Sequence, residues 1–279
     1  MGYTELRLYA EMFFDVQEFR LSLENKIRSG TVHDDAVLFS DAIARLKLTE
    51  KEMSDATIAE MNQTVAPSIL VWQQTQHGIG EHTLGLLLGV IGDPYVAHPY
   101  HWVGKGKGKR VQVADESFIR KVSQLWAYCG HGDPARKPRK GVSVEEAAAL
   151  GSPKAKKLVY LMAANCVKAG VRYYCADAEM FKPKGKEDAD KVICGLCGEQ
   201  KDDHLRKSLS DYGQLYLDSR HHYEDRVHQV ACVRCGPSGK PALAGSPLSK
   251  GHQHAAALRK VGKEILRDLW IAARDGAAT

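Results

Sequence analysis

Two pairs of cysteines in this sequence have the spacing of metal-binding turns. Each pair has the form Cys-x-x-Cys, and the pairs are Cys194 with Cys197 and Cys232 with Cys235. Two such turns supply four thiolates, which is the complete ligand set of a tetrahedral zinc ion. We therefore predict one structural Zn²⁺ site, made by Cys194, Cys197, Cys232 and Cys235. Two disulfides, or unrelated core cysteines, are the alternatives.

The segment between the two pairs is 34 residues long, which exceeds the usual spacing of about 15–20 in such sites. It must contain structure of its own, and a helix around Leu209–Val227 is the candidate. Because four cysteines already complete the site, we predict that the nearby histidines are not ligands. These are His204, His221, His222, His228, His252 and His254. The remaining cysteines, Cys129, Cys166 and Cys175, lie among apolar residues and are predicted to be core.

A Gly-Ile-Gly turn is the second chemical signal. It lies between a predicted helix from Pro67 to Gln76 and another that ends at Ile91. The first N–H groups of a helix are unpaired and carry the positive end of its dipole, so such a turn can hold a phosphate without reading bases. An ordinary tight turn between helices is the alternative. The predicted DNA contacts are Gly78, Ile79, Gly80, His82 and Thr83, with Ile79 filling the core of the turn.

Lysine and arginine gather after the N-terminal region. Residues 1–66 hold 7 Lys and Arg against 12 Asp and Glu, whereas residues 67–279 hold 32 against 22. This distribution favours a polyanion partner for the second region, although any single basic cluster is more typical of a solvated surface. The basic residues predicted to contact DNA are Lys105, Lys107, Lys109, Arg110, Arg136, Lys137, Arg139 and Lys140. The Gly-Lys run lacks the GxxxxGK[ST] spacing, which argues against nucleotide hydrolysis.

Composition limits the class of protein. The chain has 279 residues, of which 44% are hydrophobic and 26% charged, so a disordered or collagen-like chain is excluded. It has no apolar run of about 18 residues and no signal-peptide pattern at its start. We expect a cytoplasmic protein without a membrane partner.

The apolar periodicity predicts a mainly α fold with few strands. Residues 1–66 are predicted to form an N-terminal helical segment, which either packs on the body or forms a homodimer. Residues 67–176 and 251–279 are predicted to form a helical domain with a helix-hairpin-helix, and residues 177–250 a zinc-binding insertion. The expected helices are Thr4–Ile27, Asp34–Leu48, Thr49–Thr64 with a capping box at its start, Glu116–Tyr128, Val144–Leu150, Lys154–Val167 and Gln253–Arg274, with a strand at Arg110–Val113.

Four segments together resemble a known family. They are Gly78-Ile79-Gly80-Glu81-His82-Thr83 with Ile91-Gly92-Asp93, Val122–Gly130, Gly151–Leu158 with Ala163-Ala164, and Ala257–Trp270. In this order they resemble the C-terminal domain of the DEDD-type insertion-sequence transposases, which are bridge-RNA-guided recombinases, and the stand-alone phage-borne proteins that carry this domain. The resemblance covers roughly residues 67–275, with the zinc segment as an insertion, and implies a DNA-binding helix-hairpin-helix.

The chain lacks the two catalytic parts of that family. Residues 1–66 have neither the length nor the strands of the RNase-H-like domain with four acidic metal ligands. The nucleophilic serine of the family would lie in residues 131–141, which contain none. Ser143 and Ser152 lie outside the motif, and His131 is the only local base that could activate a serine.

We therefore predict a non-catalytic protein that binds double-stranded DNA, mostly through phosphates. One alternative is a transposase or recombinase subunit that acts with a partner supplying the acidic domain. Another is a module that binds structured RNA or a protein.

Overall fold

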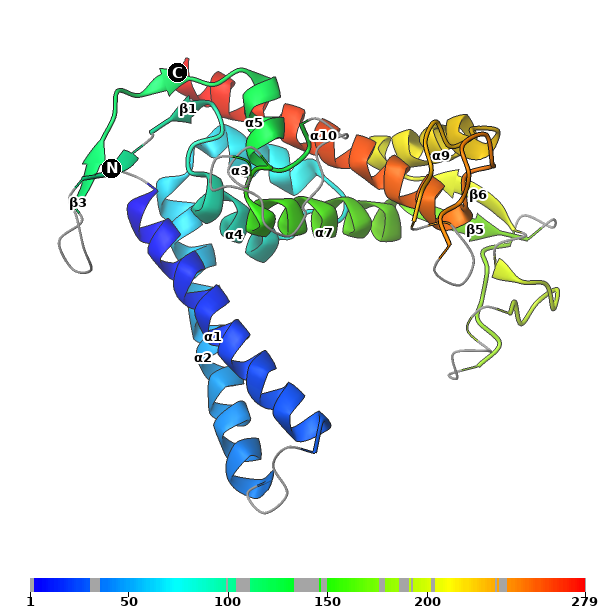
Figure 1. The fold of residues 1–279 in the computed structure, drawn as a ribbon, viewed down its shortest axis with the longest axis horizontal. Helices are drawn as coiled ribbons and strands as arrows, with labels where there is room; N and C mark the ends of the chain where they lie inside the picture. The colour runs from blue at the N-terminus through cyan, green and yellow to red at the C-terminus, as the bar shows by residue number, and fades with distance from the viewer. Residues whose placement is uncertain are drawn as a thin grey trace. The chain divides into compact units, whose positions relative to one another are not determined.

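The protein is mainly helical in the computed structural model, which confirms the predicted fold class (Figure 1). The structure describes residues 3–30, 36–98, 100–103, 111–132, 146, 150–175, 179–185, 191, 193–201, 204–233, 235 and 240–278. The helices are α1 (Thr4–Arg28), α2 (Ala36–Thr64), α3 (Pro67–Thr75), α4 (Glu81–Ile91), α5 (Val122–Tyr128), α7 (Pro153–Gly170), α9 (Asp211–Glu224) and α10 (Lys250–Ala277). None of them has a stretch both long and apolar enough to cross a lipid bilayer.

Short antiparallel strand pairs complete the described secondary structure. They are β1 (Val96–Ala97) with β4 (Phe118–Ile119), β2 (Tyr100–Val103) with β3 (Val111–Ala114), and β5 (Val171–Tyr174) with β6 (Leu205–Ser208). The expected strand near Arg110–Val113 is β3, and the expected helix from Glu116 is wrong in its first part. Phe118 and Ile119 pair with Ala97 and Val96, so the helix begins only at Val122.

The chain forms two compact units. The first contains residues 1–75, 80–159 and 266–279, and the second contains residues 76–79 and 160–265. Two of the boundaries between the units fall inside α7 and α10, and two others flank residues 76–79. The units therefore differ from the domains drawn from composition. The N-terminal helices belong to the first unit because α1 packs on α4 as well as on α2.

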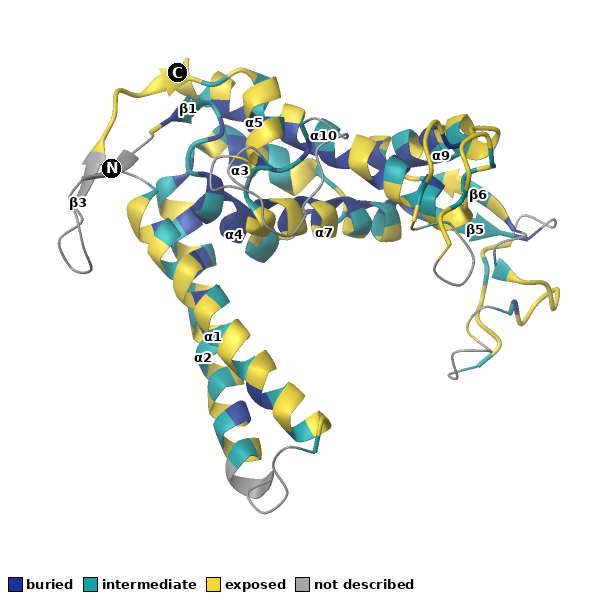
Figure 2. Cartoon of the chain, viewed as in Figure 1, coloured by how far each residue is buried: buried dark blue, intermediate teal, exposed yellow. Residues whose placement is uncertain are grey.

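In the first unit, α1 and α2 lie side by side as an antiparallel hairpin whose outer faces are largely exposed (Figures 1 and 2). The break predicted between Leu48 and Thr49 does not exist, since α2 is continuous. Thr49 is not a cap: its hydroxyl donates to the Arg45 carbonyl oxygen at 3.2 Å, one turn earlier. A threonine that bonds back in this way is compatible with a helix interior.

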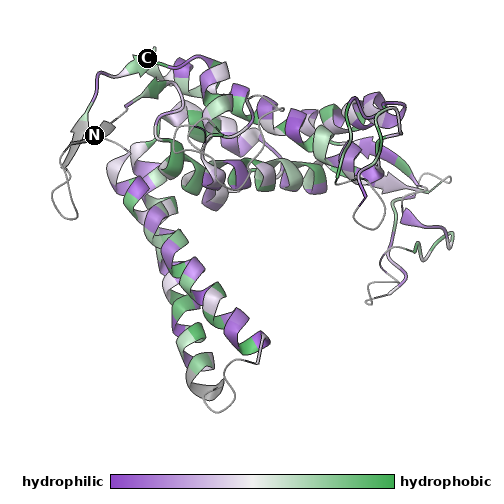
Figure 3. Cartoon of the chain, viewed as in Figure 1, coloured by the Kyte–Doolittle hydropathy of each residue, from purple (hydrophilic) through white to green (hydrophobic). Residues whose placement is uncertain are grey.

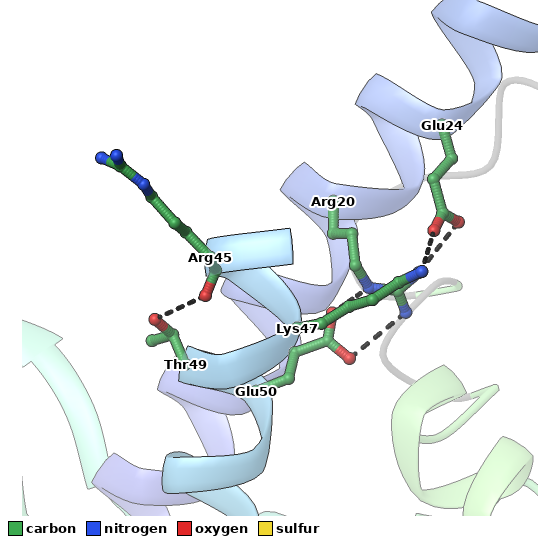
Figure 4. A network of polar contacts seen from close by, with 6 residues as sticks. All are labelled: Arg20, Glu24, Arg45, Lys47, Thr49 and Glu50. Atoms are coloured by element: carbon green, nitrogen blue, oxygen red, sulfur yellow. Dashed lines mark hydrogen bonds and ion pairs between the residues drawn. The ribbon is translucent and has the colours of Figure 1, made fainter. Parts of the chain in front are cut away.

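A charged network joins α1 to α2 (Figure 4). The Arg20 guanidinium binds both carboxylate oxygens of Glu50, and it also lies 2.8 Å from Glu24. The Glu24 carboxylate in turn lies 3.4 Å from the Lys47 ammonium. Bonding to Glu50 raises the pKa of Arg20 against the opposing effect of burial. A forked arginine–carboxylate pair fixes direction as well as distance, so it sets the register of the two helices.

The centre of the first unit is α4, whose hydrophobic sequence is visible in Figure 3. Leu84, Leu87 and Leu88 are fully buried. Gly89 allows close packing on α1, because a Cβ there would lie 2.6 Å from the Ala10 Cβ. Trp270 near the end of α10 donates from Nε1 to the Arg120 carbonyl oxygen at 2.8 Å. The apolar face of α10 is therefore core, as its period predicts.

In the second unit, the later part of α7, α9 and the first part of α10 each contribute buried side chains. The buried side chains include Met162, Cys166, Tyr212, Tyr216, Leu258, Val261 and Ile265. Ser210 caps α9 by accepting the Gly213 N–H at 3.1 Å, and this moves the start of the helix only slightly from the predicted Leu209. The end of α7 lies so close to this cap that a Cβ at Gly170 would lie 2.2 Å from the Ser210 hydroxyl.

The Gly-Ile-Gly turn has two glycines with different roles. Gly78 has φ +91°, and a Cβ there would lie 2.6 Å from the backbone carbonyl carbon of Asn165 in α7. Gly80 has φ −81° and ψ 147° as the cap of α4, and a Cβ there would meet no atom within 4 Å. Ile79 between them is buried, as predicted. Packing therefore excludes a larger residue at position 78 but not at position 80.

We expect Gly78→Ala to lower the free energy of unfolding by about 2–4 kcal/mol, because it combines a left-handed backbone with a steric overlap. Gly80→Ala is the matched control and should cost below about 1 kcal/mol, the loss typical of a poorer helix cap. Urea unfolding followed by circular dichroism measures both. Equal losses in the two variants would contradict this assignment.

Candidate metal centres

The structure gathers cysteine and histidine side chains into two groups of four, both in the second unit. Centre 1 contains Cys175, Cys194, Cys197 and His204, and centre 2 contains His228, Cys232, Cys235 and His252. Within each group the four ligand atoms lie within 4.8 Å of one another. Each group could hold a metal ion. The prediction of one site made by both Cys-x-x-Cys pairs is thereby corrected, because each pair finds two other ligands close to it.

Centre 1 is positioned by the strand pair β5–β6. Its register places Tyr174 opposite Leu205. Cys175 directly follows Tyr174 and His204 directly precedes Leu205, so the same register brings these two ligands together at one end of the pair. Two ligands separated by many residues are thus made neighbours by backbone pairing alone.

A tight turn supplies the other two ligands of centre 1. Ile193 and Gln200 pair across it, and the Gly198 N–H donates to the Cys194 carbonyl oxygen at 2.9 Å. Gly198 has φ +78° and closes the turn. The turn is held to the preceding segment because the Gly195 N–H donates to the Lys182 carbonyl oxygen at 2.8 Å.

The spacing of the side chains in centre 1 suits a tetrahedral ion. Metal–sulfur bonds of about 2.3 Å and metal–nitrogen bonds of about 2.0 Å separate two sulfurs by about 3.8 Å, and a sulfur from a nitrogen by about 3.5 Å. The Cys175 Sγ lies 3.4 Å from the Cys194 Sγ and 3.8 Å from the Cys197 Sγ. The Cys197 Sγ lies 3.3 Å from the His204 Nε2.

The orientation of His204 also fits a ligand. Its Nδ1 lies 2.8 Å from the Gln200 carbonyl oxygen. Since a carbonyl oxygen only accepts, Nδ1 must carry the proton, which leaves the lone pair of Nε2 directed at the cysteines. Phe181 packs against the imidazole ring at 5.3 Å between centroids. A ligand histidine held through its other nitrogen is the usual arrangement at protein metal sites.

The thiols of centre 1 are unequal in acidity. Burial alone would raise the pKa of Cys194, but hydrogen bonds from backbone N–H groups, including that of Cys197, lower it to about 5. Burial raises the pKa of Cys175, and the neighbouring Cys194 and Cys197 raise it further, to about 12. A divalent cation would favour the thiolate form of all of them. The backbone is therefore arranged to stabilise negative charge at Cys194 in particular.

Centre 2 connects the end of α9 to the start of α10. His228 follows α9 closely, and its N–H donates to the Ser246 carbonyl oxygen at 2.9 Å. Cys232 and Ala242 exchange two backbone hydrogen bonds of 2.8 Å. Ser249 precedes α10 and accepts the His252 N–H at 3.2 Å through its hydroxyl. His252 is thus fixed in the first turn of α10.

Distances and burial in centre 2 again match a metal site. The His252 Nδ1 lies 3.3 Å from the Cys235 Sγ and 3.9 Å from the Cys232 Sγ. The ring of His228 lies 5.1 Å from that of His252. Within the described part of the chain, the Nε2 atom of His228 is buried and has no hydrogen-bond partner. Burying such a nitrogen without a partner is unfavourable, and a metal ion would satisfy it.

Four candidate ligands therefore differ from the sequence prediction. The sequence predicts that Cys175 is a core residue and that His204, His228 and His252 are not ligands. In sequence the centres have the patterns C-x₁₈-C-x₂-C-x₆-H and H-x₃-C-x₂-C-x₁₆-H. A histidine near each Cys-x-x-Cys pair was the signal that could have divided the cysteines between two sites.

Among the residues of the predicted phosphate-binding turn, His82 makes contacts within the protein. His82 is half-buried, its Nδ1 lies 2.6 Å from the Ser54 hydroxyl, and its ring packs on Phe13 at 4.9 Å. His82 therefore links α4 to α1 and α2. Gly80 is exposed, whereas Gly78 and Thr83 are half-buried. Glu81 occupies the first turn of α4 and places a negative charge where a phosphate would approach.

The basic loops expected to contact DNA lie outside the described residues. These are Lys105, Lys107, Lys109 and Arg110, and Arg136, Lys137, Arg139 and Lys140. Of the two serines considered, Ser143 also lies outside them, and Ser152 is a helix cap whose hydroxyl accepts the Ala155 N–H at 3.2 Å. Comparison with protein-family models, with curated proteins and with solved structures gave no match.

We expect the purified chain to bind two metal ions, because both centres offer four ligands. Cys175→Ser should lower the content to about one ion per chain, since it removes a ligand from centre 1 only. Cys166→Ala is the matched control, because Cys166 is a buried cysteine of the same unit outside both centres, and it should retain both ions. Elemental analysis of gel-filtered protein measures the content. One ion in the unmodified chain, or two in Cys175→Ser, would contradict the assignment.

The cysteines outside the centres should be chemically inert. Burial raises the pKa of Cys129 and of Cys166 to about 12, so at pH 8 only about 10⁻⁴ of either thiol is ionised. Iodoacetamide at pH 8 should leave both unmodified in the folded protein and modify both in urea. Peptide mass mapping gives the result, and rapid labelling of the folded protein at Cys129 would contradict it.

Proposed function

We propose that the chain is a zinc protein that binds double-stranded DNA without cleaving it. The observation that carries the proposal is the pair of four-ligand Cys and His groups in one unit. Thiolate with imidazole in tetrahedral arrangement is the ligand set that zinc prefers. The metal would be structural, because four protein ligands leave no coordination position for water or substrate.

Binding to nucleic acid is inferred from two features. These are the excess of basic residues after residue 66 and the two candidate zinc centres. Residues 67–279 hold 32 Lys and Arg against 22 Asp and Glu, so this region favours a polyanion. Small zinc modules commonly position basic residues on the DNA backbone. The relation to transposase C-terminal domains stays a prediction from the quoted sequence motifs.

A binding experiment tests this function directly. We expect the full chain to bind a short mixed-sequence duplex, with affinity falling about tenfold or more between 50 and 200 mM salt, because phosphate contacts release counterions. Removal of the metal with a chelator should abolish binding, and added Zn²⁺ should restore it. Fluorescence anisotropy measures the affinity. An anionic polymer with the same total charge as the duplex is the control for nonspecific electrostatic binding.

Three results would reject the proposal. Binding that hardly changes with salt would exclude phosphate contacts as its source. Preference for structured RNA over the duplex in competition would change the partner. A covalent protein–DNA adduct that is lost in Ser143→Ala or Ser152→Ala would show recombinase chemistry in place of simple binding.

A further inference from the structure

The strand pair β5–β6 has two faces with different composition. Side chains alternate between the faces of a strand, and directly paired residues share a face. Tyr173 and its partner Arg206 therefore lie on the same face as Cys175 and His204, which is the face of centre 1. The opposite face carries two directly paired sets, Arg172 with Lys207 and Tyr174 with Leu205.

This opposite face, which we call the Arg172–Lys207 face, presents two cations side by side. Arg172 is paired directly with Lys207, and like charges across a strand pair are unfavourable. Among the described residues, no acidic side chain forms an ion pair with either of them. The Lys207 ammonium lies 5.1 Å over the ring of Tyr174, and the Arg172 guanidinium donates to the Lys168 carbonyl oxygen at 3.1 Å. Both charges are thus held in place by a ring and a backbone carbonyl.

Exposure shows that the face is accessible. Lys207 is exposed, Arg172 and Tyr174 are half-buried, and Leu205 is 61% exposed. On β6, the alternation of exposed and half-buried residues follows the two faces. The two cations of this face are therefore open to a partner, with the exposed Leu205 side chain beside them.

We propose that the Arg172–Lys207 face binds the phosphate backbone of the DNA duplex. This inference rests on the proposed function and names the surface that performs it. Charge complementarity selects the occupant, because paired cations without a protein anion favour neighbouring phosphates. Cations that are already held by a ring and by a backbone carbonyl lose less freedom on binding than free side chains do.

Centre 1 acts here as a positioning group. An isolated two-stranded hairpin is at best marginally stable in water, and β5 and β6 have four residues each. The metal ligands Cys175 and His204 close one end of the pair, so an ion bound there holds the two strands together. The Arg172–Lys207 face therefore depends on the metal, although none of its residues is a ligand.

Charge variants on an exposed position test the inference. Lys207→Ala should weaken binding to the mixed-sequence duplex and make the plot of log affinity against log salt shallower by about 0.9, the effect of one lost phosphate contact. Lys207→Glu should weaken binding by about tenfold or more, since it adds repulsion. Lys51→Glu in α2 is the matched control, because Lys51 is an exposed lysine of the acidic N-terminal helices, and it should bind like the unmodified chain.

The outcomes separate this inference from the proposed function. Metal content and circular dichroism must match the unmodified chain in each variant, and Lys207→Gln replaces any variant that fails this requirement. If the unmodified chain binds the duplex and Lys207→Glu binds equally well, the face is overturned and the DNA-binding function stands. If the unmodified chain does not bind the duplex, the proposed function itself fails. If Lys207→Glu and Lys51→Glu weaken binding equally, net charge and not this face is responsible.

Discussion

Between β5 and the start of α10, the second unit depends on Cys and His side chains that lie close together, because few apolar residues are buried there. Between residues 171 and 249, the described hydrophobic residues that are buried are Val171, Cys175, Cys194, Tyr212 and Tyr216. Two of these five are members of centre 1. So few buried groups cannot offset the entropy of ordering a segment of this length, and small folds of this kind generally need metal ions or disulfides. The two centres lie where the apolar core ends.

The two candidate centres join different elements of the second unit. Centre 1 closes a strand pair and a tight turn, both of which are too short to be stable alone. Centre 2 joins the region after α9 to the first turn of α10, where Ser249 contacts both the Cys235 sulfur at 3.1 Å and the His252 N–H. One centre therefore supports a surface, and the other supports the start of a long helix.

Sequence reasoning predicted the helices well where apolar periodicity was strong, as in α1, α4, α7 and α10. It failed where local signals were ambiguous. Thr49 resembles a cap but bonds back within α2, and Phe118 and Ile119 continue a helical pattern but pair as a strand. For the candidate metal centres, sequence reasoning identified the two Cys-x-x-Cys turns but joined them in one site, whereas each turn lies beside two other Cys or His residues. The register that places Cys175 beside His204 is a long-range property, and nothing in the neighbourhood of either residue encodes it.

The positions of the unit boundaries have a consequence for folding. Two of the boundaries lie inside helices, one between Val159 and Tyr160 in α7 and another between Ile265 and Leu266 in α10. Backbone hydrogen bonds between residues four apart cross both boundaries. Local unfolding that begins near either candidate centre can therefore extend along these two continuous helices.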